Sequence, residues 1–111
     1  MNQLQQNQLQ QLLTASRQTI IKAVLHDLKV WAVKPLNEYT DVDGSHPSSL
    51  DDLLSDVVTR EVEHISEGFQ KYLGIPDDED YSQEAYYIDS DFRRTIFDEI
   101  YHSKEYDAIN S

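Results

Sequence analysis

The sequence contains no cysteine among its 111 residues. Disulfides, thiolate metal sites, cysteine nucleophiles and iron–sulfur clusters are therefore excluded. Glycine and proline are scarce, with three of each, so a glycine-rich phosphate-binding loop has little to be built from. No G-x-S-x-G motif occurs, and the four histidines form no recognisable triad with the scattered acids. We therefore expect a protein that is not an enzyme and that carries no cofactor.

Long apolar runs are also missing. The longest are a few residues, far short of the roughly 20 that a membrane-spanning helix needs. The first residues, MNQLQQNQLQQLL, are rich in glutamine and lack the basic and apolar regions of a signal peptide. These features predict a cytoplasmic protein that does not interact with membranes.

Basic residues are few, and they are unevenly placed. Nine Lys and Arg stand against 21 Asp and Glu, which gives a net charge of −12. The charges of residues 1–36 sum to +3, and those of residues 37–111 sum to −15. Such a surface repels nucleic acid and anionic membranes, and it attracts basic proteins over long range. The alternative is that the acidic residues serve only solubility.

Apolar residues recur at helical spacing in three segments, and no segment alternates in the manner of a strand. A first helix is predicted over about 2–33, because the segment contains no glycine or proline and Pro35 follows it. A second is predicted over about 49–73, with Ser48 or Ser49 as its N-cap and Gly74 after its end. A third is predicted over about 91–104, with Ser90 as its N-cap.

The expected fold is therefore all-α: a single domain over 1–111, built as an antiparallel bundle of three main helices with room for a short fourth. A loop over 34–48 and an acidic, tyrosine-rich connector over 74–90 would join the helices.

The connector is the most unusual stretch of the chain. Residues 76–91, PDDEDYSQEAYYIDSD, hold seven carboxylates and three tyrosines but no Lys or Arg. Tyrosine offers a large contact area with a hydrogen-bonding tip, which suits a binding hot spot, and carboxylates around it would steer a basic partner. The predicted partner-binding residues are Asp77, Asp78, Glu79, Asp80, Tyr81, Glu84, Tyr86 and Tyr87. The alternative is that the tyrosines cover the open end of the bundle while the acids face water.

A basic partner favours one functional class. Basic protein surfaces commonly bind nucleic acid, so we expect an inhibitor of a nuclease or another nucleic-acid-binding protein. It would act by steric and charge mimicry, in the manner of immunity proteins or phage anti-defence proteins, and would not bind nucleic acid itself.

Two other functions stay open. The glutamine-rich first helix could join two copies into a homodimer, as in a structural or adaptor protein. Two Glu-x-x-His pairs, Glu61 with His64 and Glu99 with His102, could instead bind metal. Ferritin-like di-iron proteins use such pairs together with one Glu from each of two further helices. The predicted first helix contains no Glu, so we expect no metal site.

Overall fold

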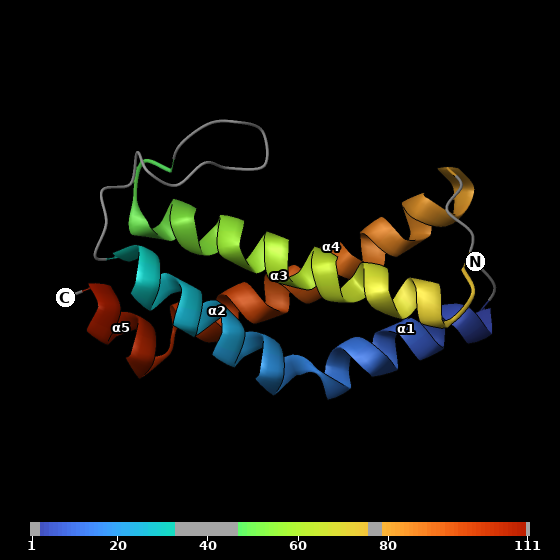
Figure 1. Cartoon of the computed structure of the whole chain (residues 1–111), viewed down its shortest axis with the longest axis horizontal. Coiled ribbons are helices and arrows are strands. Elements are labelled where there is room, and N and C mark those ends of the chain that lie inside the picture. The colour runs from blue at the N-terminus through green and yellow to red at the C-terminus, as the bar shows by residue number, and fades with distance from the viewer. Residues whose placement is uncertain (1–2, 33–46, 76–78, 111) are drawn as a thin grey trace.

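A computed structural model describes residues 3–32, 47–75 and 79–110 of the chain, and Figure 1 shows its arrangement. These residues form no strand. The predicted all-α bundle is confirmed, although it has more helices than expected. In chain order the helices are α1 (Gln3–Ala15), α2 (Arg17–Ala32), α3 (Leu50–Tyr72), α4 (Glu79–Tyr101) and α5 (Lys104–Asn110).

The predicted first helix over 2–33 is wrong as a single element, because the chain bends at Ser16 between α1 and α2. The amide of Ser16 donates to the carbonyls of both Leu12 and Leu13 at 3.1 Å. Serine competes with the helix for its own backbone groups, which makes it a weak helix former. Figure 1 shows the two helices meeting at an angle, so α1 and α2 lie along different parts of the bundle.

Helix α3 begins and ends close to where the sequence predicts. Ser49 is its N-cap, with an extended backbone and a side chain that accepts from the amide of Asp52 at 3.2 Å. Gly74 follows its C-terminal end with a φ of 71°, a conformation that glycine adopts without steric cost. The amide of Ile75 donates back to the carbonyl of Gln70 at 3.0 Å and closes the turn.

The predicted connector over 74–90 is corrected by the structure. Helix α4 begins at Glu79, so most of the acidic, tyrosine-rich stretch is helical. Ser90 lies in the middle of α4 and does not cap a helix. The predicted final helix over 91–104 ends instead at Tyr101, and Ser103 starts α5 by accepting from the amide of Tyr106 at 3.1 Å.

The interior consists of two apolar clusters in tandem along α3 and α4. The larger cluster joins α2, the first part of α3, the second part of α4 and α5; its buried members include Ile20, Val24, Leu28, Leu53, Leu54, Val58, Ile96, Ile100 and Tyr106. The smaller cluster joins α1 to the other parts of α3 and α4 through Leu9, Leu13 and Ala85. Ile65 and Phe92 pack against both clusters.

The two termini of the described chain lie at opposite ends of the bundle, as Figure 1 shows. The smaller cluster is at the N-terminal end, where α4 begins, and α5 packs at the other end. None of the helices in the described part of the chain combines the length and the apolar character of a membrane span.

Candidate protein-interaction surface

Two adjacent tyrosines stand out from the first half of α4. Ala85 and Asp89 are one turn apart and face the interior. At about 100° per residue, the intervening Tyr86 and Tyr87 must point outward. Their side chains are 58% and 60% exposed, and their ring centroids lie 6.0 Å apart in an edge-to-face arrangement. We call Tyr86 and Tyr87 the tyrosine pair.

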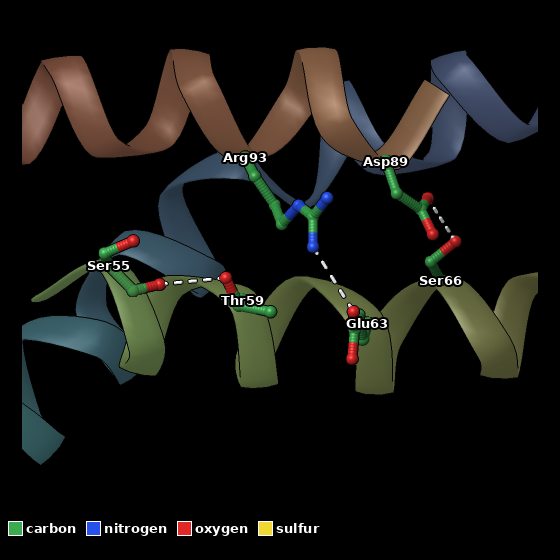
Figure 2. Close-up of polar contacts among 6 residues, drawn as sticks. All are labelled: Ser55, Thr59, Glu63, Ser66, Asp89 and Arg93. Carbon is green, nitrogen blue, oxygen red and sulfur yellow. Dashed lines mark hydrogen bonds and ion pairs between the residues drawn. The ribbon is translucent and has the colours of Figure 1, made fainter. Parts of the chain in front are cut away.

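One member of the tyrosine pair is held by a cation. The guanidinium carbon of Arg93 lies 5.5 Å from the ring centroid of Tyr86, within cation–π range. The same guanidinium binds the carboxylate of Glu63 on α3 at 3.2 Å, as Figure 2 shows. Arg93 thus ties the outer face of α4 to α3 and limits the orientations that Tyr86 can adopt.

Beneath the tyrosine pair lies a buried polar contact between the same two helices. The hydroxyl of Ser66 donates to Oδ1 of Asp89 at 2.5 Å (Figure 2), and Nε2 of Gln70 donates to the Ser66 hydroxyl at 3.0 Å. Asp89 is 8% exposed and Ser66 is fully buried. Burial raises the pKa of Asp89 to about 6; the Ser66 hydrogen bond and Arg93 oppose this rise, while Glu63 and Glu67 add to it.

A groove of about 510 Å³ opens between α3 and α4, on the side toward α5. Small hydroxyl residues, Ser55 and Thr59, line its α3 wall, and Figure 2 shows the Thr59 hydroxyl donating to the Ser55 carbonyl, at 2.9 Å. Its other lining residues are Asp51, Asp52, Val58, Arg93, Arg94 and Phe97. Because it carries both signs of charge, the groove alone does not select a partner of either sign.

Aromatic residues continue along α4 toward its C-terminal end. Phe97 and Tyr101 stack with centroids 5.7 Å apart, and Tyr101 lies 5.8 Å from the ring of Tyr106 on α5. The buried hydroxyl of Tyr106 donates to Oδ1 of Asp51 in the first turn of α3. Burial, and then this bond to a carboxylate, raise the pKa of Tyr106. This contact fixes α5 to the start of α3.

The predicted partner-binding residues fall into three groups. The structure brings Tyr86 and Tyr87 together on one exposed face. Four further residues, Glu79, Asp80, Tyr81 and Glu84, lie in the first two turns of α4, where the structure describes the backbone alone. Asp77 and Asp78 lie outside the described residues.

The two Glu-x-x-His pairs do not meet. Glu61 lies against Asp27 of α2, and its pKa is raised first by burial and then by the hydrogen bond to that carboxyl. Glu99 instead pairs with Arg17 at 3.5 Å. Among the described residues, no three His, Asp or Glu side chains are grouped so that they could hold a metal ion. The geometry therefore gives the metal alternative no support.

Sequence reasoning missed the buried pair Ser66 and Asp89, although a signal was present. The apolar positions Ile96 and Phe92 repeat at helical spacing, and the repeat extended backward reaches Asp89 and Ala85. The predicted N-cap at Ser90 starts the helix too late to include them. Arg93 compensates the charge of Asp89 only in part, because the same guanidinium binds Glu63.

A scan against models of known protein families finds no match, and neither the search of curated proteins nor the search of solved structures finds one.

Proposed function

We propose that this chain is a small binding protein that occupies a basic surface on another protein. The observation that carries the proposal is the tyrosine pair: two rings that are more than half exposed, side by side, on the most acidic helix of the chain. Exposed aromatic residues are expensive to leave in water, and adjacent ones of this kind are typical of binding hot spots.

Charge supports the class of partner. The net charge is −12, and residues 77–84 supply five carboxylates immediately before the tyrosine pair. An acidic surface of this density accelerates encounter with a basic protein and disfavours acidic competitors. Within that class we propose a nucleic-acid-handling protein such as a nuclease, which this chain inhibits by covering its phosphate-binding surface.

The mechanism requires no chemical step. The carboxylates at the start of α4 would take the positions that phosphates occupy on the partner, and the rings of Tyr86 and Tyr87 would enter apolar recesses between its basic side chains. Arg93 holds the ring of Tyr86 before binding, which reduces the rotamer entropy lost on association.

The test uses the full chain, fixed through its C-terminus, to capture proteins from a lysate of its source organism at low and moderate salt. A captured basic protein is then purified and titrated with the wild type, Tyr86→Ala, Tyr87→Ala and a matched control. Val30→Ala is the control, since Val30 is an exposed apolar residue on α2.

We expect each tyrosine variant to weaken binding by about 30-fold, the loss of roughly 2 kcal/mol that defines a hot spot, and the control to be unchanged. Reversal of Asp77, Asp78 and Asp80 to Lys should weaken binding strongly and remove the salt dependence of the binding that remains. Binding that survives both sets of variants would contradict the proposal.

A further inference from the structure

Asp89 occupies a position where an apolar residue would be expected. It lies on the buried face of α4, on the same stripe as Ala85, Ile96 and Ile100, and is 8% exposed. A carboxylate buried at a helix–helix contact costs free energy unless its charge is compensated. The groups around Asp89 therefore decide how far the charge of its carboxylate is compensated.

Asp89 accepts a hydrogen bond at Oδ1, but its charge is not fully balanced. Ser66, fixed by Gln70, supplies a neutral donor. The cation that acts on Asp89 is Arg93, and this guanidinium already binds Glu63 at 3.2 Å.

Further charges around Asp89 add to the imbalance. Glu63 and Glu67, both from α3, disfavour its ionised form. Helix α1, which packs on the same part of α4, contributes no ionisable residue. Among the described side chains, two acids and Asp89 therefore share one cation.

We propose that Asp89 is a proton-linked lock on the first half of α4. In its neutral form it holds α4 tightly against α3; in its ionised form it loosens the turns that carry Tyr86 and Tyr87. The lock rests on the burial of Asp89 and on the charges around it, and its effect on binding rests on the proposed function. It gives the protein a means of coupling the mobility of its tyrosine pair to pH.

The direction of the pH effect follows from the raised pKa. The ordinary pKa of an aspartate, expected in the unfolded chain, is 3.8, whereas burial raises the pKa of Asp89 in the folded chain to about 6. Between these values the folded state holds a proton that the unfolded state has lost. The cost of the buried charge therefore appears as pH rises from about 4 to about 6, and it is fully present at pH 7.

A bound partner would act on the same equilibrium. Basic side chains placed over the tyrosine pair favour the ionised form of Asp89, so binding should release a proton near pH 6. By thermodynamic linkage, the affinity for the basic partner should then fall as pH drops below 6.

The test compares the wild type with Asp89→Asn, which keeps a polar group of the same size and removes the charge. Asp91→Asn is the control, since Asp91 is exposed on the same helix. Carboxyl carbon NMR shifts follow the titration of Asp89. Amide hydrogen exchange, corrected for the intrinsic pH dependence, follows opening of residues 85–92 against residues 53–58.

We expect Asp89 to titrate near pH 6. In the wild type and in Asp91→Asn, the protection of residues 85–92 from hydrogen exchange, relative to residues 53–58, should be about 10-fold lower at pH 7.5 than at pH 5. In Asp89→Asn the same ratio should not change with pH. The Asp89→Asn variant should melt about 4 °C or more above the wild type at pH 7.5 and match it at pH 4.

Titration of Asp89 near pH 4, or an Asp89→Asn variant that melts below the wild type at pH 7.5, would overturn the lock. Ser66→Ala gives an independent check, because removing the donor should move the transition to higher pH. If the pH effects of Asp89 are observed but no basic partner is found, the proposed function is contradicted and the lock is not. If a basic partner binds equally well at pH 5.5 and pH 7.5, only the coupling between the ionisation of Asp89 and binding is contradicted.

Discussion

The guanidinium of Arg93 covers the ring of Tyr86 from two turns further along α4, with 5.5 Å between the guanidinium carbon and the ring centroid. The same group binds Glu63 on α3, and 18% of its side chain is exposed. One side chain thus links an exposed aromatic ring, a neighbouring helix and the charge balance around a buried acid.

Replacing Arg93 by Ala should therefore lower the free energy of unfolding by about 1 kcal/mol at pH 7, the combined size of a partly exposed ion pair and a cation–π contact. The loss should shrink near pH 4.5, where Asp89 is protonated and no longer needs a cation. Urea denaturation at the two pH values measures the difference. Arg94→Ala is the control, because Arg94 is exposed at the next position of the helix; equal losses for both variants at both pH values would contradict the role given to Arg93.

Helix α1 packs its buried leucines against other helices of the same chain. Leu9 is fully buried, whereas Leu4, on the same helix, is 65% exposed. Leu9→Ala should destabilise the fold by about 2–5 kcal/mol, and Leu4→Ala should change stability by less than about 0.5 kcal/mol. Thermal unfolding of the two variants measures this contrast. If Leu9→Ala instead lowered the molecular mass in light scattering and left the melting temperature of the dilute protein unchanged, α1 would be a dimer contact.

The hydroxyl of Tyr106 links the C-terminal helix to the start of α3. Tyr106→Phe removes the hydrogen bond to Asp51 without changing the shape of the ring. We expect a loss of about 1–2 kcal/mol, because the bond has a carboxylate acceptor and the tyrosine that donates it is buried. Chemical denaturation followed by far-ultraviolet circular dichroism measures it. Tyr101→Phe is the matched control, since Tyr101 is partly exposed, and a similar loss in that variant would refute a specific role for the Tyr106 hydroxyl.

Two glycines at and near the C-terminal end of α3 should respond in opposite directions to the same substitution. Gly68 lies inside the helix with open space where a Cβ atom would lie, so Gly68→Ala should stabilise the protein by about 0.5–1 kcal/mol. Gly74 has equal space but a φ of 71°, so Gly74→Ala should destabilise it by about 1 kcal/mol. Differential scanning calorimetry of both variants tests the pair, and a shift of the same sign in both would show that local backbone conformation is not the cause.

Helix α3 could be predicted from the sequence because its signals agree. A capping serine, acids in the first turn, a broad apolar face and a terminal glycine all indicate the same boundaries. The bend at Ser16 could not be predicted, since the residues on both sides favour helix and the apolar spacing runs through it. Leu13 and Ile20, on either side of the bend, pack into different clusters, and this is a property of the packed molecule that adds to the weak helix preference of Ser16.

The start of α4 could not be predicted for a related reason. Clustered acids and Pro76 are typical of a loop, but Ala85 packs between α1 and α3 and holds the segment in a helix. The sequence predicts Tyr86 and Tyr87 as contact residues, but their exposure is known only once the helix is known. Asp89 could not be identified, because a carboxylate in an acidic stretch gives no sign of burial until the helix that carries it is known.

The tandem arrangement of the two clusters has a consequence for how the protein unfolds. Helices α3 and α4 cross both clusters, but α1 touches one and α5 the other. Among the side chains that the structure describes, the cluster at the N-terminal end has three fully or nearly buried apolar members and the other has eleven, so the N-terminal end should form a weaker cooperative unit, or foldon. The end that carries the tyrosine pair can then open and reclose many times while the rest of the bundle stays folded.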